Sequence, residues 1–259
     1  MSIKDRITKP QQAKRQATEL KGASGTGKTE QIGRLISAGY KVLYGSVERK
    51  ASTIHHLNPD MFVLEKFDFP ANAAQVGNTQ SDLYEAIKFL RTPDHGYDIF
   101  AVDSGMRLFD EMSQFLKNEK RLTGYDLWGA FAEKGDAAIK KLVELTDGAL
   151  WPAPVHVIVT WGVELGTDWK GKRSAIPIMD GKRLGPRLDY LFDNVLYLAK
   201  KEDATAGKVD YAIYTAGTEE FDAKVSSPVR LPAIITNPNL ATILRAIEQG
   251  KWPPDEKPS

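Results

Sequence analysis

The sequence predicts an α/β fold in which a mainly parallel β-sheet is flanked by helices. Two observations carry this prediction. Apolar segments with the composition of strands alternate with amphipathic segments along most of the chain. The segments at 97–102 and 155–161 are mostly apolar, which is typical of strands buried on both faces of a parallel sheet. A chain of 259 residues, of which 42% are hydrophobic, can build one such domain with a large core.

The expected elements follow in order along the chain. Strands are expected at 17–21, 41–47, 97–102, 155–161, 195–198, 211–215 and 229–235. Helices are expected at 30–37, 81–91, 106–118, 125–147 and 239–249. The segment 17–21 is poor in strand-forming residues, so its strand should be short or distorted.

Composition also divides the chain into three parts. Residues 1–16 hold five basic side chains and one acidic side chain, and they are expected to form a basic N-terminal arm or helix. Residues 17–250 should form the main domain. Residues 251–259 are rich in proline and charge, which predicts a flexible C-terminal tail.

The most specific motif lies at residues 22–29, which read GASGTGKT and match the phosphate-binding pattern G-x-x-x-x-G-K-[ST] in full. Its glycines let consecutive backbone N–H groups point at phosphate oxygens, and the helix that follows directs its positive end at the same anion. Lys28 can reach the β- and γ-phosphates, and the Thr29 hydroxyl can ligate Mg²⁺. We therefore expect ATP and Mg²⁺ as cofactors. The expected nucleotide contacts are Gly22, Ala23, Ser24, Gly25, Thr26, Gly27, Lys28 and Thr29.

A P-loop site also needs a carboxylate at the end of a buried strand to hold the Mg²⁺ shell. Asp103 follows the apolar run 97–102 and meets this requirement. Many ATPases carry their water-activating Glu at the next position, which is Ser104 here, so that Glu must come from elsewhere. Glu48 follows the strand expected at 41–47. We expect this strand beside the P-loop strand, so the Glu48 carboxylate can face the γ-phosphate. The alternative is a surface Glu48 that pairs with its basic neighbours.

Composition excludes several classes of protein. The chain has no cysteine, which rules out disulfides and thiolate metal sites and fits a reducing cytoplasm. The net charge is +1, so any nucleic-acid binding must come from a local patch. The guanine-specifying motif [NT]-K-x-D is absent, which argues against a GTPase. No apolar run approaches the roughly 20 residues of a membrane span, so we expect a cytoplasmic protein with no membrane partner.

The order of these features resembles the RecA-like P-loop NTPase core. More closely, the sequence resembles phage-encoded RecA-like ATPases of the single-strand annealing and recombination type, which act in the cytoplasm of a bacterial host cell. The resemblance spans about residues 20–235. It is carried by GASGTGKT, VLYGSVE, IFAVDSG, HVIVTW, DGKRLGPRLDYLFDNVLYL and FDAKVSSPVRLP.

The resemblance implies roles for individual residues. Asp103 holds the Mg²⁺ shell, and Glu48 activates water. The strand end at 160–161 matches the place where the RecA fold senses the γ-phosphate, although the amide residue found there in RecA is missing. Lys224 matches a segment that offers a basic residue to a neighbour's ATP, which makes Lys224, and secondarily Arg230, a catalytic cation that acts between subunits. The alternative is a solvated Lys224 at a strand end.

A basic stretch at residues 165–187 is the candidate DNA-binding element. It carries six basic and two acidic side chains, a net charge of +4, around one tryptophan. Cations around an aromatic ring suit single strands, because phosphates pair with the cations and a base stacks on the ring. The stretch follows the strand at 155–161, where RecA-like proteins carry a mobile DNA-binding loop. A solvated hairpin whose tryptophan packs on the domain is the alternative. The expected DNA contacts are Trp169, Lys170, Lys172, Arg173, Lys182 and Arg183.

Together these features predict an ATPase that binds single-stranded DNA in phage recombination or annealing. ATP should order the basic loops and promote self-association into a ring or filament, and a single-strand DNA-binding protein is a candidate partner. Two other functions stay open. One is a nucleotide kinase in which residues 170–187 form a lid over the substrate. The other is a nucleotide-switched assembly factor with slow hydrolysis.

Overall fold

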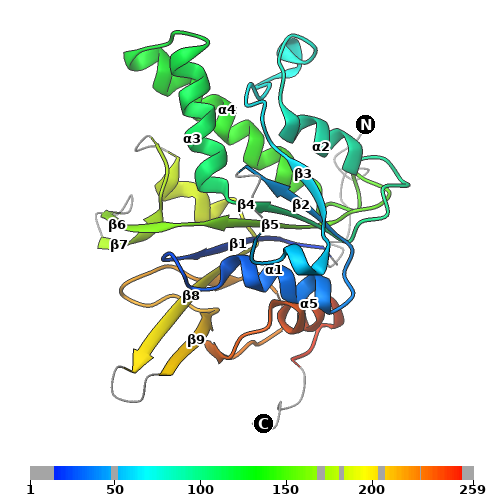
Figure 1. Ribbon diagram of the computed structural model, residues 1–259, viewed down its shortest axis with the longest axis vertical. Coiled ribbons are helices and arrows are strands. Elements are labelled where there is room, and N and C mark those ends of the chain that lie inside the picture. The colour runs from blue at the N-terminus through cyan, green and yellow to red at the C-terminus, as the bar shows by residue number, and fades with distance from the viewer. Residues whose placement is uncertain are drawn as a thin grey trace, which may run out of the picture.

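The computed structural model describes residues 15–47, 52–167, 173–180, 184–203, 208–227 and 229–252. A central sheet lies between two layers of helices (Figure 1). One face is covered by helices α2 (Asp82–Leu90), α3 (Gly105–Asn118) and α4 (Gly124–Glu144). The other face is covered by α1 (Lys28–Ser37) and α5 (Leu240–Gln249). Within the described residues, no helix combines the length and the apolar character that crossing a membrane requires.

The core of the sheet is parallel. Its strands are β1 (Ala17–Gly22), β2 (Val42–Ser46), β3 (Asp60–Val63), β4 (Ile99–Asp103), β5 (His156–Trp161) and β8 (Asn194–Asp203). They lie in the order β8-β1-β5-β4-β2-β3, and each pairs in parallel with its neighbours. The structure therefore confirms the predicted fold class, an α/β fold with a RecA-like P-loop NTPase core and a mainly parallel sheet flanked by helices.

Antiparallel strands extend this core at one edge and beyond it. Strand β9 (Lys208–Tyr214) pairs with β8, and β11 (Ile234–Thr236) pairs with β9. Strand β10 (Lys224–Val225) pairs separately with β8. A second, two-stranded sheet is formed by β6 (Val163–Thr167) and β7 (Arg173–Pro177), directly after β5. Within the described residues, the short 3₁₀ helices are η2 (His55–Leu57), η3 (Ala73–Gln75) and η4 (Gly185–Tyr190).

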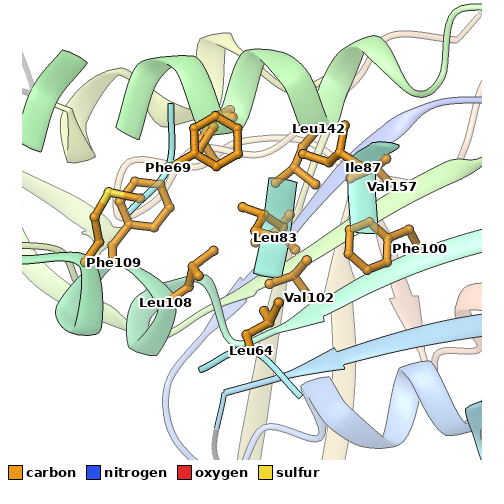
Figure 2. Packing of buried hydrophobic residues seen from close by; sticks show 14 of the residues in the cluster. Leu64, Phe69, Leu83, Ile87, Phe100, Val102, Leu108, Phe109, Leu142 and Val157 are labelled. Atoms are coloured by element: carbon orange, nitrogen blue, oxygen red, sulfur yellow. The ribbon is translucent and has the colours of Figure 1, made fainter. Parts of the chain in front are cut away.

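Two apolar clusters hold the layers together. On the α2, α3 and α4 side, Phe100, Val102 and Val157 of the sheet pack against helix residues that include Leu83 and Leu142 (Figure 2). On the α1 and α5 side, the buried residues include Leu20, Ile32, Leu35, Leu196, Ile213 and Leu244. The parallel strands are held by packing on both faces, so their carboxyl ends are rigidly positioned. The site described below lies at these ends.

Strand β1 corrects one expectation. It is a regular strand of six residues that are all buried, and it pairs along its length with β5 and β8, so the prediction of a short or distorted strand is wrong. Two of its polar side chains, Thr18 and Lys21, find partners inside the protein. Thr18 accepts a hydrogen bond from Asn194 Nδ2 at 3.2 Å, and the Lys21 ammonium lies 2.6 Å from Asp189 Oδ2. Pairing on both sides outweighs the weak strand propensity of the segment.

The position of β2 corrects a second expectation. Strand β2 lies between β3 and β4, and β5 and β4 separate it from β1, so the prediction that it neighbours the P-loop strand is wrong. The apolar runs of these strands have similar compositions, and their order in the sheet is therefore not visible in the sequence. The strand expected at 229–235 is also shorter, because only Ile234–Thr236 pairs with β9.

Candidate nucleotide-binding site

The P-loop connects the end of β1 to the start of α1, and its glycines are required by its geometry. Gly25 and Gly27 have φ values of 74° and 88°, in the left-handed region that favours glycine. A β-carbon at Gly22 would lie 2.4 Å from the carbonyl oxygen of Leu198 on β8, closer than side chains approach. The buried Thr26 hydroxyl donates to the Ala23 carbonyl at 2.9 Å and braces the turn. The loop is therefore built to place its backbone against a ligand.

The Lys28 side chain folds over this loop. Its ammonium group donates to the carbonyl oxygens of Gly22 and Ala23, each at 2.8 Å. Burial lowers the pKa of Lys28, and the negative charge of Asp103 acts in the opposite direction. The two carbonyl partners are neutral. An anion bound in the loop can replace them, and its negative charge would favour the protonated form of Lys28. Its predicted role as a phosphate ligand fits this position.

Asp103 accepts hydrogen bonds from three hydroxyl groups on three different elements. Thr29 on α1 donates to its Oδ2 at 2.6 Å, and Tyr44 on β2 donates to the same oxygen at 2.8 Å. Thr160 on β5 donates to Oδ1 at 2.5 Å. The predicted meeting of Thr29 and Asp103 is thus present in the structure. These hydroxyls fix the carboxylate at the carboxyl ends of the strands, beside the P-loop.

The chemistry of this donor set fits Mg²⁺. The ion prefers oxygen ligands and is usually held by one or two carboxylates together with substrate phosphates and waters. Asp103 supplies a carboxylate and Thr29 a hydroxyl, with their oxygens in direct contact. Among the described residues, no group of three or more His, Cys, Asp or Glu side chains is gathered as a complete protein-only metal site.

Tyr44 was not predicted from the sequence. Ser46, two residues further along β2, pairs in register with Asp103, so Tyr44 faces the same side of the sheet as the carboxylate. Predicting the contact between Tyr44 and Asp103 would have required knowing that β2 lies beside β4, whereas the sequence analysis expected β2 beside β1. Thr160 lies where γ-phosphate sensing was expected, and its hydroxyl contacts Asp103.

Several predicted residues lie outside the described part of the chain. Glu48 is one of them; the nearby strand end at Ser46 lies beside Asp103. Arg173 is the first residue of β7 and pairs in register with Thr167 on β6. The other predicted DNA contacts outside the described residues are Trp169, Lys170, Lys172, Lys182 and Arg183. Their roles stay predictions.

Lys224 lies on β10 beside a buried charge cluster that the sequence reading missed. The cluster consists of Glu19 and Lys21 on β1 and Asp189 on η4. The side chains of Glu19 and Lys21 are fully buried, and neither carboxyl oxygen of Glu19 has a hydrogen-bond partner. Burial raises the pKa of Glu19 well above its usual value, and the Asp189 charge adds to this, whereas Lys21 and Lys224 act in the opposite direction. The role of Lys224 toward a neighbouring subunit stays a prediction.

Comparisons with solved structures find similar proteins at low identity. A KaiC-like protein, PH0186, from Pyrococcus horikoshii OT3 is 12% identical, with a TM-score of 0.36, over 77% of this chain and 77% of that chain. An ATPase from the type III secretion system of pathogenic bacteria is 15% identical, with a TM-score of 0.43, over 71% and 52%. A third solved structure, described as an ATPase domain, is 12% identical, with a TM-score of 0.42, over 86% and 80%.

No curated protein sequence matches the chain. A family does match, and it is described as the AAA domain. The match runs over residues 15–227, which include the P-loop, Asp103 and the β6–β7 hairpin. Together with a complete P-loop joined by a hydrogen bond to a strand-end carboxylate, this match shows that the chain is a nucleotide-binding P-loop ATPase and belongs to the AAA domain family.

Proposed function

We propose that this protein hydrolyses ATP with Mg²⁺ and that ATP controls its binding to single-stranded DNA in phage recombination or annealing. The hydrogen bond between Thr29 and Asp103 carries the catalytic part of the proposal, because it joins the P-loop helix to the end of β4. Both oxygens are in place to serve as metal ligands.

Each residue then has a physical task. Mg²⁺ held by Thr29 and Asp103 would neutralise the charge that develops on the β- and γ-phosphate oxygens. Lys28 exchanges its two carbonyl partners for phosphate oxygens. Glu48 accepts the proton of the attacking water, and the closeness of the β2 end to Asp103 supports this role. Lys224 of a neighbouring subunit adds positive charge in the transition state.

The β6–β7 hairpin is the proposed DNA-binding element, and the described residues connect it to Asp103 in two ways. It continues directly from β5, whose Thr160 bonds Asp103. After β7, Asp180 accepts hydrogen bonds from Ser113 at 2.7 Å and Lys117 at 3.1 Å, both on α3. Helix α3 begins two residues after Asp103. A change at Asp103 on nucleotide binding can therefore reach the hairpin from both of its ends.

The end of α3 and the loop that follows it form a weaker DNA-binding candidate. Its lysines have acidic partners within the chain, since Lys117 lies 3.1 Å from Asp180 and Lys120 lies 2.9 Å from Asp68. Phosphate contacts there would require these ion pairs to open. This favours the hairpin and its predicted basic residues as the surface for the DNA strand.

The decisive experiment measures the ATPase rate with and without a single-stranded oligonucleotide, alongside particle size by light scattering. The proposal expects DNA to stimulate hydrolysis and ATP to increase particle size. Lys28→Ala is the inactive control. Asp180→Asn should keep the basal rate but reduce stimulation by DNA, because it weakens the connection to α3.

The other outcomes identify the rival functions. Phosphate transfer to a nucleoside monophosphate, with no response to DNA, would identify a kinase. Slow hydrolysis that ignores DNA but changes particle size would identify an assembly switch. Either result would overturn the DNA part of the proposal and leave the nucleotide site intact.

A further inference from the structure

Lys200 on β8 lies close to the P-loop, although it belongs to no sequence motif. Strand β8 pairs in parallel with β1 as far as Gly22, which is opposite Leu198. Lys200 follows two residues later. Its Nζ atom lies 3.9 Å from the position that a β-carbon would occupy on Gly25. Lys200 is exposed, and so is Gly25, so both face the space in which a ligand of the loop would lie.

Strand alternation places Lys200 on the correct face of the sheet. Leu198 belongs to the apolar cluster under α1 and α5, and Lys200 points to the same side because it is two residues further on. Thr160 and Asp103 meet on this side as well, since Thr160 is the register partner of Leu20, another member of that cluster. The cross-strand partner of Lys200 is Tyr211 on β9, which lies on the same face and can pack against the lysine stem.

The negative charge of a bound nucleotide suggests a role for Lys200 in phosphate binding. The phosphates of ATP carry several negative charges, and the P-loop itself contributes only the cation Lys28. Lys28 is half-buried and donates to the Gly22 and Ala23 carbonyls, and Lys200 approaches the exposed apex of the loop from the neighbouring strand. Two cations on different elements can hold the phosphates from two directions.

We propose that Lys200 binds the phosphates of the nucleotide held in the P-loop of its own subunit, as a second cation beside Lys28. The inference rests on the proposed ATP-binding function. It differs from the role predicted for Lys224, because Lys200 acts within one subunit. Its contribution to affinity should therefore be independent of protein concentration.

The test compares adjacent lysines of one strand. Lys201 is exposed, points to the opposite face and pairs in register with Asp210, which makes Lys201→Ala the matched control for Lys200→Ala. The affinity for Mg²⁺·ATP is measured by isothermal titration calorimetry at two protein concentrations. Lys200→Ala should weaken binding by about 10-fold or more, as expected for the loss of a charge-assisted hydrogen bond. Lys201→Ala should match the wild type, and Lys200→Arg should retain most of the affinity.

Three results would contradict the inference. Equal affinities of Lys200→Ala and Lys201→Ala would show that Lys200 does not touch phosphate. A Lys200→Arg variant as weak as Lys200→Ala would show that its charge is not the cause. An effect that appears only at the higher protein concentration would point to contact between subunits. If the wild-type protein itself binds no ATP, the proposed function fails instead, and Lys28→Ala provides the baseline for that outcome.

Discussion

Thr29 and Asp103 are 74 positions apart in the chain, yet the Thr29 hydroxyl donates a 2.6 Å hydrogen bond to the Asp103 carboxylate. The contact joins the first turn of α1 to the last residue of β4. Because β5 lies between β1 and β4, the two residues reach each other over the end of β5, where Thr160 binds the other carboxylate oxygen. The P-loop and the metal-binding carboxylate are therefore held as one unit.

This relationship predicts different results for two substitutions at Thr29. Thr29→Ser keeps a hydroxyl and should retain Mg²⁺-dependent hydrolysis. Thr29→Val keeps the shape but removes the oxygen, and hydrolysis should fall by roughly 10²-fold, as for removal of one preorganised interaction with the transition state. Steady-state ATPase rates over a range of Mg²⁺ concentrations measure the effect. Equal rates for the two variants would show that Thr29 is not a metal ligand.

Glu48→Gln separates nucleotide binding from chemistry. Gln keeps the size and hydrogen bonding of the side chain but cannot take a proton from water. ATP affinity should stay within a few-fold of the wild type, and hydrolysis should fall by roughly 10²-fold, within the range typical of general bases. Calorimetry and single-turnover hydrolysis measure the two quantities. An unchanged hydrolysis rate would assign Glu48 to the surface and give the role to another carboxylate.

Glu19 should make the stability of the protein depend on pH. Burial raises the pKa of Glu19 in the folded state above its ordinary value of 4.5. Below that value both states hold the proton and stability is full. As pH rises, the unfolded chain releases the proton first, so the free energy of unfolding falls until the folded-state pKa is passed. The loss should approach about 1.4 kcal/mol per pH unit within that window.

Glu19→Gln tests this dependence because Gln has no proton to lose. Its free energy of unfolding should rise relative to the wild type as the pH increases from 5 to 8, measured by urea denaturation at each pH. Glu119, an exposed residue at the end of α3, provides the control Glu119→Gln, which should follow the wild-type curve. Parallel curves for Glu19→Gln and the wild type would show that Glu19 is ionised in the folded protein.

Much of the fold could be predicted from local patterns. The apolar runs that became β4 and β5 are buried on both faces, and the period of 81–91 gave α2, which Ser81 caps by accepting a hydrogen bond from the Tyr84 N–H. The P-loop could be predicted residue by residue, because its pattern specifies backbone geometry directly. Asp103 was predicted because a P-loop site needs a carboxylate at the end of a buried strand to hold the Mg²⁺ shell.

The remaining features depend on contacts between distant segments. Strand β5 separates β1 from β4, and β2 is the other neighbour of β4. The residue that reaches Asp103 from this neighbour is Tyr44. The β1 segment contains Glu19 and Lys21, which weaken any strand prediction, and the approach of Asp189 from η4 explains how Lys21 is accommodated. Lys200 has no local signal at all, because its place at the P-loop follows from the register of β8 on β1.

The predicted role of Lys224 between subunits can be tested by mixing variants. Lys224→Ala should lower ATPase activity if it removes a cation from a neighbour's site. Adding Lys28→Ala subunits should partly restore activity, because an intact Lys224 and an intact P-loop can then come from different chains. Arg230→Ala, tested in the same way, measures the secondary candidate. A drop in activity that mixing does not rescue would place Lys224 in its own subunit, where it lies near Glu19.

The last prediction separates charge from stacking in DNA binding. Reversing Lys170, Lys172 and Arg173 to Glu should weaken single-strand binding for all sequences alike, because phosphates carry no sequence information. For each phosphate interaction removed, the salt dependence should flatten by about 0.7 in log–log slope. Trp169→Ala should instead cost about 1–3 kcal/mol because it removes a stacking surface, with little change in slope. Both variants should still bind ATP, since neither change touches the P-loop.

Fluorescence anisotropy with a labelled oligonucleotide at several salt concentrations distinguishes these two signatures. Lys88→Glu on α2 is a suitable charge-reversal control, because Lys88 is half-exposed on a helix remote in sequence from the β6–β7 hairpin and pairs locally with Glu85 at 2.7 Å. Its binding curve should match the wild type apart from a small uniform shift. If the wild-type protein with ATP binds no oligonucleotide even at low salt, the hairpin is not a DNA-binding element. The basic residues around Trp169 would then be interpreted as a lid or a solvated turn, and phosphate transfer to nucleotides becomes the activity to measure.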